Sequence, residues 1–158
     1  MNWKILIGIM LVVGSAGVWF AYMNNIKQSA TGMAGLQSNE ITIYKSPSCG
    51  CCGGYVQYLK DADFTVNVVE KANLDPVKKE QGIPDDMLSC HTAVIGNYFI
   101  EGHVPIEAVK KLLAEKPDID GIALPGMPAG SPGMHGAKSG QWTIYAIKNG
   151  ESTVFLKV

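Results

Sequence analysis

ITIYKSPSCGCCGGYVQYLK, residues 41–60, combines a strand pattern with a helix pattern, and the expected fold begins with these two elements. Its first four residues alternate as in a strand and are rich in β-branched side chains, and Ser46-Pro47-Ser48 ends that strand. Apolar residues within 55–59 recur at helical spacing, which predicts a helix. The cysteines between the two elements are therefore expected at the N-terminus of that helix.

Elements further along the chain complete an α/β plan in which strand-helix-strand is followed by strand-strand-helix. We expect a strand over 64–69, a short helix over 75–81, a hairpin of 92–95 with 98–100, and a helix over 105–116. That order is the thioredoxin-like plan, so the sequence predicts a thioredoxin-like fold. A last β-hairpin, 142–147 with 153–158, is expected around Asn149-Gly150.

A long segment rich in glycine, proline and methionine separates the last predicted helix from the last hairpin. It covers residues 117–141 and contains the run LPGMPAGSPGMHG at 124–136. A structureless connection of this length is uncommon in a compact domain, so we expect the segment to serve a function. Its two methionines, Met127 and Met134, lie where a core methionine has little to pack against.

The N-terminal part of the chain differs in composition from the rest. No charged residue occurs from Ile5 to Met23, and a helix of that length spans roughly 28 Å, close to the hydrocarbon width of a bilayer. We expect residues 1–23 to be a signal anchor, or a signal peptide cleaved after its small residues, and the domain to be exported. Residues 24–39 are expected to form a flexible tether and residues 40–158 the folded domain.

Composition limits the partners of the protein. The chain has 158 residues, of which 47% are hydrophobic and 17% charged, and its formal net charge of -1 suits one globular domain. Lysine supplies every basic residue and arginine is absent, so the bidentate side chain that usually grips guanine or phosphate is missing. Nucleic acid is therefore not expected as a partner.

The cysteine spacing points to a sulfur site. Cys49 and Cys52 have the C-x-x-C spacing, and a helix N-terminus favours their thiolates. Because both metal binding and disulfide exchange need thiolates, this spacing alone does not choose between them. Cys51 favours metal, since a third adjacent thiol invites wrong pairing in a disulfide shuttle. A fourth thiol, Cys90, precedes the third strand, where the thioredoxin-like plan brings the chain beside the helix start.

The donor set favours copper among the soft metal ions. Three sulfurs in four residues form a poor tetrahedral zinc knuckle, and iron-sulfur spacings differ from this one. Cu(I) accepts bridging thiolates, and thioether sulfur is also a soft copper ligand. The predicted metal-site residues are Cys49, Cys51, Cys52, Cys90, Met127, Met134, His91 and His135. The methionines and these two histidines are expected either to bind the metal or to pack beside it, and His103 to be a structural hydrogen-bonding residue.

These motifs resemble the copper-resistance proteins called CopG, an exported thioredoxin-like family first described as a domain of unknown function. The resemblance spans residues 41 to 157 and is carried by Cys49-x-Cys51-Cys52, Cys90-His91-Thr92, Glu101-Gly102-His103-Val104-Pro105 and the proline-glycine-methionine block at 125–134. It implies a periplasmic protein. The apolar run itself favours an anchor in the inner membrane, with secretion after cleavage as the alternative. The resemblance also implies that the four cysteines hold copper as a multi-copper Cu(I) thiolate cluster able to cycle between Cu(I) and Cu(II), with other periplasmic copper-handling proteins as partners.

Two other hypotheses remain open at this point. The chain could be a thiol-disulfide oxidoreductase in which Cys49 is the nucleophile and Cys52 the resolving sulfur. It could instead be a structural zinc module that presents a surface to a membrane partner. Copper retention, disulfide-exchange activity and the metal content of protein purified without added metal distinguish the three.

Overall fold

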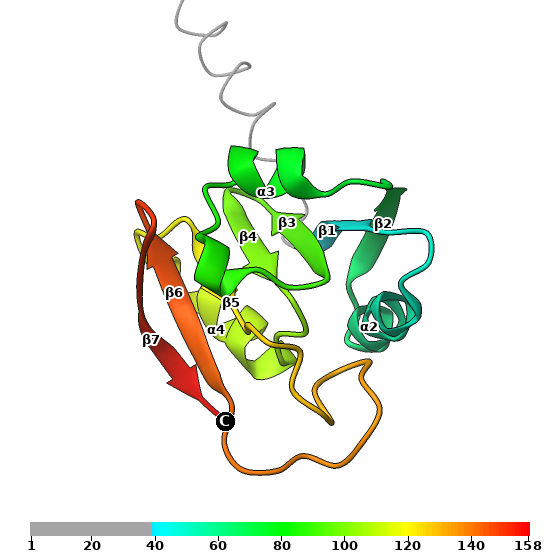
Figure 1. Ribbon diagram of the computed structural model, residues 1–158. Coiled ribbons are helices and arrows are strands. Elements are labelled where there is room, and N and C mark those ends of the chain that lie inside the picture. The colour runs from blue at the N-terminus through cyan, green and yellow to red at the C-terminus, as the bar shows by residue number, and fades with distance from the viewer. Residues whose placement is uncertain (1–38) are drawn as a thin grey trace, which may run out of the picture. The chain divides into compact units, whose positions relative to one another are not determined.

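The computed structural model describes residues 39–158, which form a mixed α/β domain built on a seven-stranded sheet (Figure 1). The order across the sheet is β2-β1-β3-β4-β5-β6-β7. The strands are β1 (Glu40–Lys45), β2 (Thr65–Glu70), β3 (His91–Ile95), β4 (Tyr98–Glu101), β5 (Gly121–Ala123), β6 (Thr143–Lys148) and β7 (Glu151–Lys157). The helices are α2 (Gly50–Asp61), α3 (Asp75–Glu80) and α4 (Ile106–Glu115), with a 3₁₀ turn, η1 (Asp85–Met87).

The predictions for the N-terminal part of the chain are not tested by this structure. The predicted signal anchor or signal peptide at 1–23 lies outside the described residues, as does the predicted tether apart from Asn39. Between residues 39 and 158, no helix combines the length and the apolar character that crossing a bilayer requires.

Both predicted supersecondary units are present. Strands β1 and β2 pair in parallel and are connected by α2, while β3 and β4 form an antiparallel hairpin. β3 also pairs antiparallel with β1, which joins the two units into one sheet. The C-terminal hairpin of β6 and β7 turns at Asn149 and Gly150, whose φ angles of 51° and 80° suit a two-residue hairpin turn.

The segment 117–141 is not one continuous connection, contrary to the prediction. It contains β5, which pairs in parallel with β4 and antiparallel with β6. Three residues are too few to show a strand periodicity, and the strand begins with a glycine, which is uncommon in strands. Packing explains Gly121, because a Cβ atom there would lie 2.4 Å from Cγ of Phe99.

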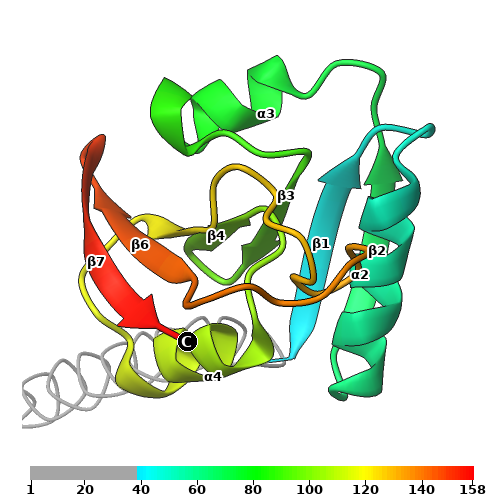
Figure 2. The same cartoon turned by 60° about the horizontal axis from the view of Figure 1, so that its bottom comes forward.

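Each face of the sheet carries its own core. Helices α2 and α4 cover one face, where Ile43, Leu59 and Leu112 belong to the larger cluster of buried side chains. On the other face, near α3, a smaller cluster joins η1 to Phe99 of β4. Figure 2 shows α3 and α4 on opposite sides of the strands. Neighbouring residues of β3 and β4 therefore point toward different surroundings.

Candidate metal centre

Four cysteine sulfurs meet where β1 ends, α2 begins and β3 begins. Cys49 is the N-cap residue of α2, and Cys51 and Cys52 lie in its first turn. Cys90 directly precedes β3, and the pairing of Lys45 with His91 places the start of β3 beside the end of β1. All four Sγ atoms lie within 4.8 Å of one another. The fold thus brings a residue 38 positions away in the chain to the C-x-C-C motif.

In this structure the site is partly oxidised. Cys49 and Cys52 are joined by a disulfide, whereas Cys51 and Cys90 are free. The Sγ of Cys51 lies 3.5 Å from that of Cys49 and 4.0 Å from that of Cys90, and the Sγ atoms of Cys52 and Cys90 are 3.6 Å apart. Reduction of one disulfide therefore presents four thiols in a single cluster.

Two buried histidines extend this cluster with nitrogen atoms. The Sγ of Cys90 lies 3.3 Å from Nδ1 of His91 and 3.1 Å from Nε2 of His103, and these three residues form a second group of donors within 4.8 Å. Nδ1 of His103 lies 2.6 Å from the carbonyl oxygen of Pro132. A carbonyl only accepts, so Nδ1 carries the proton and the lone pair of Nε2 faces the sulfur.

The sequence predicts a structural hydrogen-bonding role for His103, and its bond to the Pro132 carbonyl is of that kind. Its second nitrogen, however, joins the donor group, and sequence reasoning missed this. The predicted hairpin of β3 and β4 could have indicated that His103 lies near Cys90. Because β4 runs back along β3, a residue shortly after β4 returns to the start of β3, where Cys90 lies.

Burial sets the protonation of the metal-free site. It raises the pKa of the Cys90 thiol to about 12, with the neighbouring Cys51 as the next cause. Burial also lowers the pKa of His91 to about 3, assisted by the charges of His103 and Lys78. At neutral pH the imidazole is therefore in its neutral, ligating form. The Cys90 thiol keeps its proton until a metal displaces it.

Tyr55 forms an aromatic wall beside these donors. Its ring centroid lies 4.7 Å from that of His91 and 5.6 Å from that of His103. The buried Tyr55 hydroxyl donates a hydrogen bond of 2.9 Å to the carbonyl of Val104. This packing limits the movement of both imidazole rings, which are themselves 4.8 Å apart.

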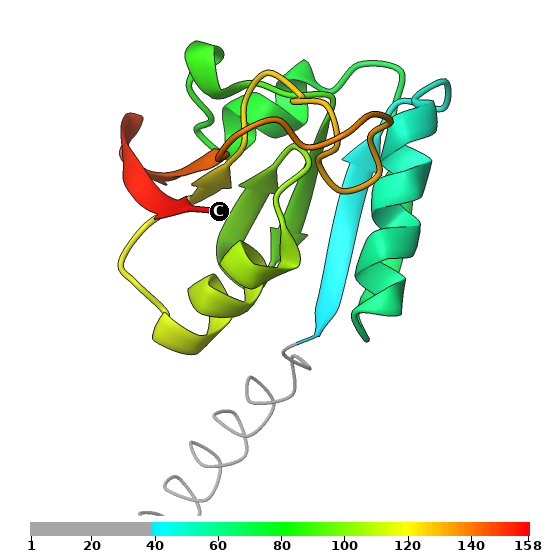
Figure 3. The same cartoon turned by 90° about the horizontal axis from the view of Figure 1, so that it is seen from below.

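Residues 124–142, which we call the methionine loop, cross from β5 to the first turns of α2 (Figure 3). Gly133 touches the helix backbone so closely that a Cβ atom on it would lie 2.4 Å from the nitrogen of Tyr55 and 2.9 Å from the oxygen of Cys51. A Cβ atom on Gly54 would in turn lie 2.9 Å from the oxygen of Gly133. Two glycines therefore permit a backbone contact that places the loop beside the sulfurs.

The remaining predicted site residues all belong to the methionine loop. Met134 is half-buried next to Gly133, whereas the Met127 side chain is 41% exposed. His135 is exposed and lies outside both groups of donor atoms. The structure thus brings the four cysteines and His91 together with His103, and it does not bring His135 to them.

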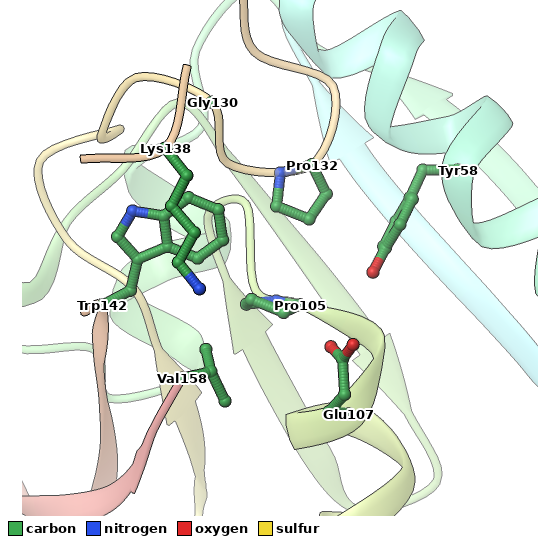
Figure 4. Close-up of a pocket in the computed structure, with 8 residues that line it drawn as sticks. All are labelled: Tyr58, Pro105, Glu107, Gly130, Pro132, Lys138, Trp142 and Val158. Atoms are coloured by element: carbon green, nitrogen blue, oxygen red, sulfur yellow. The ribbon is translucent and has the colours of Figure 1, made fainter. Parts of the chain in front are cut away.

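The methionine loop also roofs a shallow pocket of about 310 Å³ (Figure 4). The rings of Tyr58, Pro105, Pro132 and Trp142 form its apolar walls, and Lys138 and Glu107 supply charges at its rim. Pro132 faces both sites, because its ring lines this pocket while its carbonyl accepts the hydrogen bond of His103.

Comparison with known proteins identifies the family. Residues 87–134 match the family described as "Protein of unknown function, DUF411". The solved structure titled "Copper resistance protein copG- Form 1" is 35% identical, covers 77% of this chain and 98% of its own, and superposes with a TM-score of 0.71. Form 2 of that protein is 36% identical, covers 75% and 97%, and gives a TM-score of 0.70. No curated protein matches the chain. With this identity over most of both chains, the protein belongs to the CopG family of copper-resistance proteins.

Proposed function

We propose that this protein binds copper at Cys49, Cys51, Cys52 and Cys90 as part of copper resistance. The observation that carries the proposal is the convergence of four sulfurs, from two distant segments, within 4.8 Å. Both solved relatives are titled copper resistance proteins, and four sulfurs form a soft donor set.

The sulfur spacing supports Cu(I) held as a multi-copper thiolate cluster. Neighbouring sulfurs lie 3.5, 3.6 and 4.0 Å apart, so one thiolate is near enough to its neighbours to share copper ions with them. Three of the four sulfurs come from the N-cap and the first turn of α2. That crowding suits bridging thiolates better than the two separated ligand pairs of a structural zinc site.

The disulfide supports redox cycling of the bound metal. Oxidation of the reduced Cys49 and Cys52 thiols to their disulfide releases two protons and two electrons, and those electrons reduce two Cu(II) ions to Cu(I). Cys90 belongs to both the sulfur group and the group that contains His91 and His103. Imidazole nitrogens also bind copper, so Cys90 links a soft donor set to a harder one.

Three further parts of the proposal concern the fold type, the location and the partners of the protein. The strand order β2-β1-β3-β4, with β1 and β2 parallel and the β3-β4 hairpin antiparallel to them, supports a thioredoxin-like core. The uncharged run at 5–23 supports export to the periplasm with an inner-membrane anchor. Other periplasmic copper-handling proteins are the proposed partners.

A second candidate function, thiol-disulfide exchange, is favoured by one observation, the Cys49–Cys52 disulfide itself. The two free thiols favour metal binding instead. Cys51 lies 3.5 Å from Cys49 and Cys90 lies 3.6 Å from Cys52, so four sulfurs gather where a disulfide shuttle needs only two.

Retention of Cu(I) tests the proposal. The fully reduced protein is loaded without oxygen and challenged with a colorimetric Cu(I) chelator. We expect one or more equivalents of copper to be retained, and fewer in the Cys90→Ser variant. Insulin reduction that survives in a Cys51→Ser/Cys90→Ser double variant, together with no copper retention by the wild type, would establish the second candidate instead.

A further inference from the structure

A buried ionic network lies behind the Cys90 segment, on the α3 face of the sheet. Glu101, the last residue of β4, is fully buried, and its carboxylate pairs with the ammonium group of Lys78 from α3, which is itself 7% exposed. The same carboxylate accepts hydrogen bonds of 2.6 Å from the backbone nitrogen of Ser89 and 2.6 Å from the hydroxyl of Thr92. Lys78 also donates to that hydroxyl at 3.1 Å.

The two oxygens of this carboxylate hold the two residues that flank the donors. Oε1 of Glu101 binds Ser89, which precedes Cys90, and Oε2 binds Thr92, which follows His91. The backbone nitrogen of Gly102 donates to the carbonyl of His91 at 3.0 Å and so holds the same segment through its backbone. One side chain thus spans the tetrapeptide that carries both donors.

The network is close to the donors but separate from them. Side chains alternate along β3, so Thr92 points toward α3 while His91 packs against Tyr55 of α2. Glu101 belongs to neither group of donor atoms. A substitution in this network therefore removes no donor side chain and alters only the contacts that hold the donor segment.

A buried ion pair is weak evidence for stability, because removing two charges from water offsets most of their attraction. The value of such a pair can lie in fixing one arrangement of the chain, and here the arrangement is that of a metal-binding segment. We infer that Glu101 is a positioning residue, which clamps the segment from Ser89 to Thr92 and so fixes Cys90 and His91 for metal binding. For its metal readout this inference rests on the proposed function.

Outer partners that orient metal ligands typically contribute 10- to 100-fold to metal affinity. We therefore expect Glu101→Gln to weaken Cu(I) binding of the reduced protein by about 10- to 100-fold. The matched control is Glu70→Gln, because Glu70 pairs with Lys45 of the same sheet at 2.8 Å through a carboxylate that is 53% exposed. The control is expected to bind copper within about two-fold of the wild type.

A gentler pair of variants keeps the test informative should Glu101→Gln fold poorly. Thr92→Val removes only the hydroxyl that donates to the carboxylate, whereas Thr92→Ser retains it. If the hydrogen bond positions the segment, the valine variant loses affinity and the serine variant recovers it. A purely structural role of the side-chain volume predicts the opposite order, since valine matches threonine in shape.

A metal-free readout separates this inference from the proposed function. In a Cys51→Ser background with the disulfide intact, Cys90 is the one remaining free thiol of residues 39–158, and its alkylation by iodoacetamide reports how firmly it is held. We expect Glu101→Gln and Thr92→Val to change this rate several-fold, with no change for Glu70→Gln or Thr92→Ser. That result in a protein that retains no copper would uphold the positioning role and refute the copper site. Unchanged rates and affinities in both variants would overturn the inference.

Discussion

Replacing Gly54 by alanine tests whether close contact between two glycines holds the methionine loop over the sulfurs. A Cβ atom at this position would lie 2.9 Å from the oxygen and 3.0 Å from the Cα of Gly133. Both neighbours are backbone atoms, so a side-chain rotation cannot relieve the clash. The loop must move away from the helix, and the carbonyl of Pro132 that orients His103 must move with it.

Gly53 provides the matched control, because a Cβ atom there would meet nothing within 4 Å. Alanine at either position of α2 gains about 0.8–1.0 kcal/mol of helix propensity. Overpacking costs about 1–3 kcal/mol, and only Gly54→Ala incurs that cost. The free energies of unfolding of the two variants should therefore differ by about 1–3 kcal/mol, with Gly53→Ala the more stable.

Urea unfolding at neutral pH measures this difference, and chelator competition on the reduced variants measures copper retention. We expect Gly53→Ala to be at least as stable as the wild type with unchanged copper retention. Gly54→Ala should be less stable than Gly53→Ala and retain less copper. Equal stability and equal retention in the two variants would refute the role that we assign to this backbone contact.

Three further outcomes follow from the site. In metal-free protein, His91 should lower the free energy of unfolding by about 1.4 kcal/mol per pH unit as the pH drops from 6.5 toward 3. Over that range the unfolded chain binds a proton on this imidazole, whereas the buried imidazole of the folded protein does not. Urea titrations at several pH values check this, and the same pH slope in His91→Gln would contradict it. Protein with the Cys49–Cys52 disulfide intact should retain less Cu(I) than reduced protein, and equal retention would mean that these two sulfurs do not bind. His103→Gln should weaken Cu(I) binding more than His135→Ala, since only His103 lies beside Cys90, and the reverse order would restore His135 as a ligand.

Much of this architecture could be predicted from local pattern. The alternation at 41–44 and the helical spacing at 55–59 give β1 and α2, and Asn149-Gly150 marks the last turn. Strand β5 could not be predicted, because it is three residues long and its glycine is required by the close approach of Phe99, whose ring and carbonyl oxygen leave no room for a Cβ atom. Its existence depends on neighbours that are distant in sequence.

The candidate site likewise contains parts that the sequence predicts and parts that it does not. The cluster of Cys49, Cys51 and Cys52 is local, and the expected strand order was enough to bring Cys90 to it. Sequence spacing could not show that Nε2 of His103 faces Cys90, because that depends on the hydrogen bond to Pro132 in the methionine loop. His135 follows Met134 directly, yet its exposed position shows that adjacency in sequence does not determine where a side chain points.

Copper X-ray absorption on the reduced, copper-loaded protein identifies the atoms bound to the metal and so tests the shared sulfur site itself. We expect sulfur as the dominant nearest neighbour of copper, and a weaker sulfur signal after Cys90→Ser. A spectrum with only nitrogen and oxygen neighbours, or one that Cys90→Ser leaves unchanged, would contradict the shared sulfur site.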